Sequence, residues 1–180
     1  MSYPLQRKTM QTIERGKVRI IDHFTTDVPD HWRHTGDAVL PSSRGLVMNA
    51  NSSLFQKALT TFGFFRFQIE LNLMEHDEFL IYLRTANEVI ELRFDAFKKA
   101  RYRHADGQEI ETEVSTTLTV QWILNDERYS LQIIGQGITT LASRVPIASF
   151  RAMPFEIELQ STLSKGSVMI RESFYESVNE

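Results

Sequence analysis

Two glutamates in the C-terminal region have the spacing of a catalytic pair. In residues 155–160, apolar side chains alternate with Glu156, Glu158 and Gln160, which is typical of a strand with one buried face. Glu156 and Glu158 then share the outer face about 7 Å apart, within the range that general acid and base carboxylates occupy. A solvated strand face has the same pattern, and nothing nearby in the sequence would separate the two pKa values. The two glutamates are therefore weak catalytic candidates, and no other catalytic residue is predicted.

Two histidines, His31 and His34, flank Trp32 in a loop that contains proline and aspartate. Such a pair could bind a metal if Asp30 or Asp37 converged on it, but histidines in polar loops are also common as plain surface residues. The chain has no cysteine, which removes thiolate ligands, disulfides and thiol nucleophiles. We predict no metal site and no cofactor.

Three consecutive strand-like segments in residues 64–95 carry the main candidate binding surface. If the first two pair as a hairpin with their apolar residues on one face, Asn72 lies opposite Tyr82 and Glu70 lies opposite Arg84. A two-residue turn at 86–87 would then close the second hairpin and bring the third segment alongside. The outer face of this three-stranded ribbon is predicted to carry Glu70, Asn72, Tyr82, Arg84, Glu91 and Arg93.

These residue types suit a sugar. Amides and carboxylates accept hydrogen bonds from hydroxyl groups, and an aromatic ring such as that of Tyr82 provides a surface on which a pyranose can lie. Charge pairing across strands would select the same residues for structural reasons alone. A binding role and a structural role therefore stay open at this stage.

A basic segment and an acidic segment follow, joined by an Asp-Gly pair at 106–107 that strongly indicates a hairpin. A type I′ turn there would place His104 opposite Glu109 and Tyr102 opposite Glu111. The basic arm could receive an acidic glycan or phosphate, but its acidic partner would neutralise much of that charge, so we favour a ladder of ion pairs. The basic residues are Lys98, Lys99, Arg101, Arg103 and His104.

Most of the chain shows alternation with a period of two residues. Short strands separated by turns run from residue 17 onward, including 117–124 and 129–133, each half-buried by pattern. Residues 51–60 allow a short helix, which we treat as a connector. A turn at 165–166 is expected before the last strand. We predict an all-β fold, an antiparallel two-sheet β-sandwich of jelly-roll type with roughly a dozen strands and little helix.

Composition limits the domain organisation and the partners. The 180 residues suit one well-filled core without a linker, so we predict an N-terminal arm, residues 1–16, and a single domain, residues 17–180. With 20 Lys and Arg against 23 Asp and Glu, the net charge of -3 gives no overall attraction to nucleic acid or to an anionic membrane. The N-terminus has no apolar signal region and no segment has the length of a membrane span. If Met1 is the native start, we expect a cytoplasmic protein.

Three sequence features together resemble the concanavalin A-like lectin/glucanase jelly roll, particularly its laminin-G-like and glucanase-like branch. They are Asp22-His23-Phe24 followed by Trp32 and a Gly-Asp turn, the segment LTTFGFFRFQIELNL running into FLIYLR, and the segment TLTVQWILNDERYSLQIIG. The resemblance covers residues 17–174. It implies the fold, and it implies membership of a group that contains carbohydrate-binding domains, glycoside hydrolases, polysaccharide lyases and protein-interaction modules.

The catalytic motifs of that group are not matched here. The hydrolase branch uses E-x-D-x-x-E, whereas residues 155–160 and 87–92 offer only isolated glutamates. The lyase branch uses a strand similar to Y-F-K-A-G-x-Y-x-Q, of which residues 97–104 keep only a faint likeness. We therefore expect a non-catalytic, lectin-like domain that binds carbohydrate. The alternatives are a polysaccharide-active glycosidase or lyase on the same fold, and a protein-interaction or oligomerisation module, so a homo-oligomer stays open.

Overall fold

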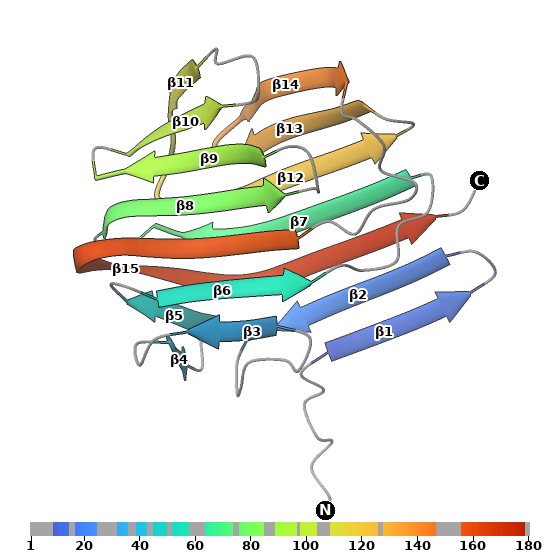
Figure 1. Cartoon of the computed structure of the whole chain (residues 1–180), viewed down its shortest axis with the longest axis horizontal. Coiled ribbons are helices and arrows are strands. Elements are labelled where there is room, and N and C mark those ends of the chain that lie inside the picture. The colour runs from blue at the N-terminus through green and yellow to red at the C-terminus, as the bar shows by residue number, and fades with distance from the viewer. Residues whose placement is uncertain are drawn as a thin grey trace, which may run out of the picture.

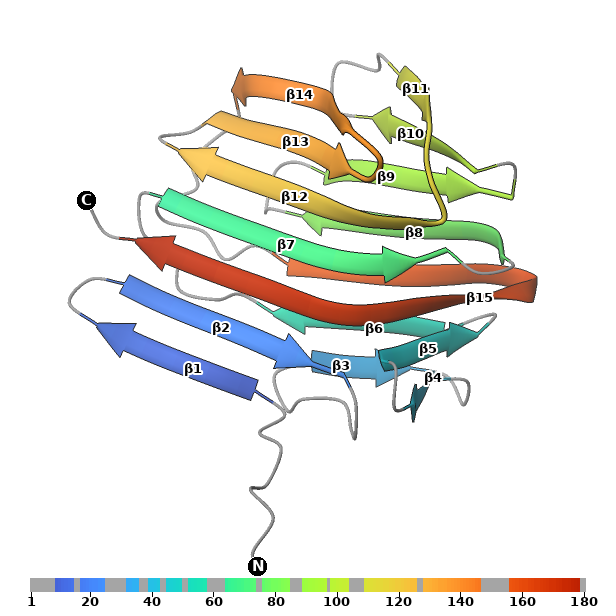
Figure 2. The ribbon, with the colours of Figure 1, turned by 180° about the vertical axis from the view of Figure 1, so that it is seen from behind.

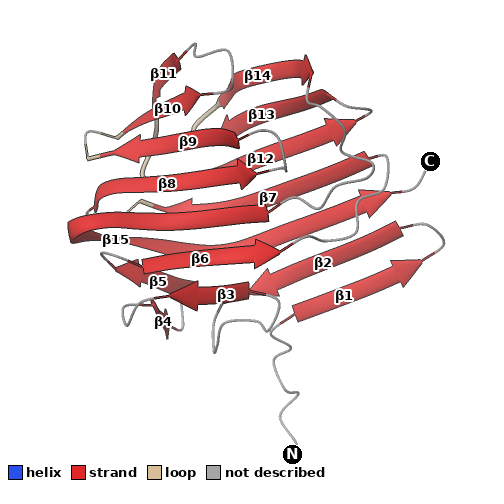
Figure 3. Cartoon of the chain, in the orientation of Figure 1, coloured by secondary structure: helices blue, strands red, loops and turns tan. Residues whose placement is uncertain are grey.

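The structure is a computed structural model of the chain that describes thirteen segments. They are residues 9–14, 17–24, 32–35, 39–42, 45–49, 52–57, 64–73, 76–84, 89–96, 98–103, 109–125, 128–146 and 156–178. Throughout these residues the structure is β-strand, turn or extended chain, with no helix (Figure 3). Consequently, none of them forms a helix that could cross a membrane.

Two antiparallel sheets pack face to face, as the alternation of the sequence predicts (Figures 1 and 2). Sheet B holds, in spatial order, β3 (Trp32–Thr35), β6 (Ser52–Lys57), the first part of β15 (Glu156–Val178), β8 (His76–Arg84), β9 (Val89–Asp95), β10 (Lys99–Arg103) and β11 (Glu109–Glu113). The all-β, two-sheet jelly-roll prediction is confirmed.

Sheet A is built around the second part of β15. On one side of it lie, in spatial order, β7 (Phe64–Asn72), β12 (Thr117–Asn125), β13 (Arg128–Ile134) and β14 (Ile138–Pro146). The other side pairs with β2 (Lys17–His23) and β5 (Gly45–Asn49). Strand β2 pairs in turn with β1 (Thr9–Glu14), and β5 pairs with β4 (Val39–Ser42). Strand β1 comes from within the predicted N-terminal arm.

The core lies between the two sheets. It consists of the side chains that point inward at every second position of each strand. Trp32 and Trp122 are buried, and Trp32 makes an edge contact with Phe24 at 5.9 Å between ring centroids. The hydroxyls of Tyr102 in sheet B and Tyr129 in sheet A hydrogen-bond each other inside the core. Because a buried phenol needs a partner, this pair lets two polar groups cross the apolar layer between the sheets.

Strand β15 belongs to both sheets. Residues 156–162 pair with β6 and β8 in sheet B, and residues 167–178 pair with β5, β2 and β7 in sheet A. The strand bends at one end of the sandwich and returns behind itself (Figure 1). The expected turn at 165–166 is therefore the corner of one continuous strand, with an irregular register between Thr162 and Gly166. Bends of this kind are how a strand changes sheet.

The predicted hairpin between β7 and β8 is wrong. These strands lie in different sheets, and β15 pairs with both of them. The hydrophobic pattern could not reveal this, because both sheets point their apolar residues at the same core. The second predicted hairpin is correct in detail: Ile81 pairs with Leu92, Leu83 with Ile90, and Tyr82 with Glu91.

Two further expectations need correction. Residues 52–57 form strand β6 and are neither helix nor connector. In the hairpin of β10 and β11, Arg103 pairs with Glu109 and Tyr102 with Ile110, one residue away from the predicted register. The observed pairing puts basic side chains opposite acidic ones on the outer face, whereas the predicted register would have set Glu111 against the buried Tyr102. His104 and the turn itself lie outside the described residues.

We expect Gly45→Ala to destabilise the fold by about 2 kcal/mol or more. Gly45 has φ 142°, and a Cβ there would overlap the carbonyl oxygen of Ile170 on β15. Gly137→Ala is the matched control, because a Cβ at Gly137 meets nothing within 4 Å. Urea unfolding of both variants measures the effect, and equal free energies of unfolding would contradict this account of Gly45.

Candidate functional site

One row of outward-facing residues crosses all of sheet B. It is fixed by strand register, since each member is the direct cross-strand partner of the next, so the side chains stand about 4.8 Å apart on a common face. The row runs through β3, β6, β15, β8, β9, β10 and β11 as Arg33, Phe55, Glu158, Tyr82, Glu91, Arg103 and Glu109.

Four of the six predicted binding residues lie together on this face. Tyr82 and Arg84 on β8 adjoin Glu91 and Arg93 on β9. The other two, Glu70 and Asn72, belong to β7 in sheet A, where they pair with Thr119 and Thr117. The predicted six-residue surface is thus divided between opposite sides of the sandwich, for the same reason that the predicted hairpin fails.

The two catalytic candidates join these four residues. Glu158 pairs with Tyr82 and Glu156 pairs with Arg84 across the β15–β8 ladder. Arg84 forms an ion pair with Glu158, and its Nη1 lies 3.9 Å from Oε1 of Glu156. Their side chains are only partly exposed, 36% for Arg84 and 19% for Glu158. Residues more than 70 positions apart in the sequence therefore make one charged cluster.

Arg84 also covers the ring of Tyr82. Its guanidinium carbon lies 4.4 Å from the ring centroid, within cation–π range. On the next strand, Nη2 of Arg93 lies 3.0 Å from Glu91, and Nη1 lies 3.6 Å from Glu78. Each cation of the cluster is thus held by at least one carboxylate, and the Arg84 guanidinium lies over one face of the Tyr82 ring.

Phe55 is the member that sequence analysis missed. It is half-buried on the outer face of β6, directly beside Glu158, while Leu54 and Gln56 point into the core. The predicted connector over residues 51–60 gives Phe55 no defined direction, whereas the strand Ser52–Lys57 points it outward by alternation. We call the group Phe55, Tyr82, Arg84, Glu91, Arg93, Glu156 and Glu158 the sheet B platform.

The environment of Tyr82 changes its acidity. Partial burial, assisted by the nearby Glu91 carboxylate, raises the pKa of the Tyr82 phenol above its ordinary value of 10.0. Arg84 and Arg93 act in the opposite direction and are outweighed. The phenol is therefore neutral at physiological pH and keeps its proton as a hydrogen-bond donor.

The other residue groups singled out in the sequence either have a structural role or lie outside the described residues. The basic and acidic arms form the expected ladder of ion pairs, with Lys99 Nζ 3.2 Å and Arg101 Nε 3.0 Å from carboxylate oxygens of Glu111. His34 is exposed on the edge strand β3, whereas His31, Asp30 and Asp37 lie outside the described residues. Among the described residues, no group of three or more His, Asp or Glu side chains has a geometry that could hold a metal.

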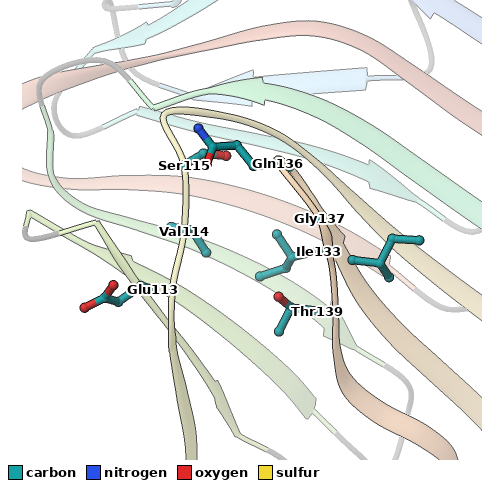
Figure 4. A pocket seen from close by; sticks show the side chains of 9 residues that line it. Glu113, Val114, Ser115, Ile133, Gln136, Gly137 and Thr139 are labelled. Atoms are coloured by element: carbon teal, nitrogen blue, oxygen red, sulfur yellow. The ribbon is translucent and has the colours of Figure 1, made fainter.

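A separate hollow of about 350 Å³ lies away from the platform, between the β11–β12 connection and the β13–β14 turn. Figure 4 shows Glu113, Val114 and Ser115 on one side of it, opposite Ile133 and Thr139. A Cβ at Gly135 would meet the Ser115 hydroxyl, which would have to rotate away from its hydrogen bond to the Thr117 carbonyl. The residues that line the hollow include one carboxylate and no aromatic ring. The hollow therefore lacks the aromatic side chains and paired charges that make the platform the better candidate for a binding site.

Solved structures share this fold, although no protein-family model and no curated protein matches the sequence. A lectin from Bauhinia forficata in complex with GalNAc aligns with TM-score 0.65 at 10% identity, over 91% of this chain and 100% of that one. The Bacillus licheniformis beta-glucanase gives TM-score 0.62 at 8% identity, over 89% and 98%. A Crh5 transglycosylase gives 0.63 at 10%, over 99% and 92%. The chain has the concanavalin A-like jelly-roll fold.

The charges around Tyr82 can be tested by titration. We expect Glu91→Gln to lower the pKa of Tyr82 and Arg84→Gln to raise it further, because the first removes a nearby negative charge and the second a positive one. The ultraviolet absorbance of tyrosinate measures both shifts, with Tyr82→Phe as the subtraction that isolates this residue. Shifts in the same direction in both variants would contradict the assignment.

The same raised pKa has a consequence for stability. In the folded protein Tyr82 keeps its proton at pH values where an unfolded tyrosine loses it. Its contribution to the free energy of unfolding is therefore fully present below the unfolded pKa of about 10 and is lost as pH rises through the folded pKa. Urea unfolding at alkaline pH should show a shallower loss of stability for Tyr82→Phe than for the unsubstituted protein.

Proposed function

We propose that this protein binds carbohydrate through the sheet B platform and does not cleave it. The observation that carries the proposal is the arrangement of two aromatic side chains, Phe55 and Tyr82, on either side of Glu158 in one row. The two rings stand two strand spacings apart, about 9.6 Å, which is wide enough for more than one sugar ring. Aromatic faces flanked by groups that bond to hydroxyls are what a sugar site requires.

The polar members of the platform supply the hydrogen bonds. Glu156, Glu158 and Glu91 offer carboxylate oxygens as acceptors, while Arg84 and Arg93 offer guanidinium donors. The side chains involved are between about a fifth and two fifths exposed, so a ligand can reach them. Because each guanidinium is already balanced by a carboxylate, the platform favours a neutral, hydroxyl-rich ligand over an anionic one.

The structural neighbours support a ligand of this class. One is a lectin in complex with GalNAc, one a beta-glucanase, and a further Crh5 transglycosylase structure is a complex with NAG. At identities of 8–10% these likenesses concern the fold, and they support carbohydrate as the ligand class.

Binding is favoured over catalysis by the ion pairs. A general acid must be free to approach the glycosidic oxygen that it protonates. The carboxylates nearest to Tyr82 are instead paired with arginines, Glu158 with Arg84 and Glu91 with Arg93. These charge-assisted contacts engage the carboxylate oxygens, so the geometry suits binding better than proton transfer.

The test is a glycan-array screen of the full chain, followed by calorimetry with the glycan that binds. We expect Tyr82→Ala and Phe55→Ala each to weaken binding roughly tenfold, the loss of about 1.4 kcal/mol of stacking and buried area. Arg101→Ala is the matched control, since Arg101 lies on the same face in an ion pair with Glu111 but two strands from Tyr82. Its affinity should not change.

Two results would overturn the proposal. Absence of binding to every glycan would remove carbohydrate as the ligand class. Release of new reducing ends from the bound glycan, lost in Glu158→Gln, would replace the lectin with the alternative, a glycosidase on the same platform. Circular dichroism of every variant checks that the fold is retained.

A further inference from the structure

The row of outward residues on sheet B continues past the platform to Arg33 on β3. Arg33 is the direct cross-strand neighbour of Phe55, and its side chain is exposed. Among the described strands β3 pairs only with β6, so Arg33 lies at the open edge of the sheet. A ligand that lies along the row over Tyr82 and Phe55 therefore meets Arg33 at its next position.

The positive charge of Arg33 is not balanced by its surroundings. Three other arginines of this face each contact a carboxylate: Arg84, Arg93 and Arg101. No carboxylate in the described part of the chain forms an ion pair with Arg33. Along the row the first carboxylate is that of Glu158, two strand spacings or about 9.6 Å away, and it is already in contact with Arg84.

Arg103 provides the comparison within the same row. It lies between Glu91 on β9 and Glu109 on β11, so a carboxylate stands one strand spacing away on each side. Arg33 instead has the aromatic ring of Phe55 on one side and no described strand on the other. Because neighbouring opposite charges offset the attraction of a cation, an added anion gains more at Arg33 than at Arg103.

A guanidinium beside an aromatic ring suits a sugar that carries an acidic group. The ring of Phe55 offers an apolar face to the pyranose, as the Tyr82 ring does two strands away. The planar guanidinium of Arg33 can donate two parallel hydrogen bonds to the oxygens of one anionic group. A neutral sugar at this position would use the ring and leave the charge of Arg33 without a partner.

We propose that Arg33 selects a glycan whose sugar beyond Phe55 carries a carboxylate or sulfate group, while the sugar at Tyr82 is neutral. This inference rests on the proposed binding of carbohydrate at the sheet B platform and names the class of glycan. From Tyr82 to Arg33 the row covers three strand spacings, about 14 Å, so the ligand is an oligosaccharide. Since exposed ion pairs contribute little free energy, Arg33 acts on selectivity more than on overall affinity.

Calorimetry with matched oligosaccharides tests the role of Arg33. The probe is the glycan that binds most tightly on the array, prepared with a neutral sugar, a uronic acid or a sulfated sugar at either end. We expect one of the acidic forms to bind about fivefold more tightly than the neutral form at low salt, and the preference to shrink as salt is added. The two acidic forms distinguish carboxylate from sulfate. Arg33→Gln should remove the preference and leave the affinity for the neutral form unchanged.

Arg103→Gln is the matched control, the same substitution at an exposed arginine of the same row on the other side of Tyr82. It should keep the preference. Equal affinities for the neutral and both acidic forms would overturn the proposal, as would a preference that survives Arg33→Gln or is lost equally with Arg103→Gln. In each of these cases carbohydrate binding itself still stands. If no form binds the unsubstituted protein, the proposed function fails, and the selectivity of Arg33 with it.

Discussion

The rest of the structure depends on the sharing of β15 between two sheets. Its first part pairs with β6 and β8 and its second part with β5, β2 and β7, so backbone hydrogen bonds from one strand join both layers. Side-chain packing alone would leave the two sheets free to slide, because apolar contact has no direction. The shared strand fixes their relative position. It also brings Glu156 and Glu158 beside strand β8, which lies far earlier in the chain.

What the sequence predicted well depends on alternation within a short segment. The inward residues of the central strands and the register of β8 with β9 follow from period-two patterning and a two-residue turn. What it could not predict was which sheet a strand joins. In both sheets the apolar side chains point to the same core, so β7 has the same pattern whether it pairs with β8 or crosses to the other layer. Because of that ambiguity, the sequence predicts one surface for Glu70, Asn72 and Tyr82, although β7 and β8 lie in different sheets.

The outward residues of the strands distinguish sheet A from sheet B, whereas the inward residues do not. Since burial constrains only the inward half of each strand, the outward half is free to differ between sheets, and it does. The outer face of sheet B is a lattice of paired charges around Phe55 and Tyr82, whereas the centre of sheet A is a row of amides between threonine and isoleucine. One scaffold thus presents two chemically distinct flat surfaces, and strand register alone determines which residues meet on each.

The contact between Arg84 and Tyr82 sets how strongly the platform can hold a ligand. The guanidinium lies over the ring at 4.4 Å and is also held by Glu158. A sugar that stacks on the same ring face must first displace it. An exposed cation–π contact is worth about 0.5–1 kcal/mol and a half-exposed ion pair about as much again, so displacement costs about 1–2 kcal/mol. That reduces affinity by roughly fivefold to thirtyfold relative to an open ring. Part of this cost is recovered where the displaced guanidinium donates to sugar hydroxyls, so Arg84 opposes the stacking of a ligand that cannot accept its hydrogen bonds and tolerates one that can.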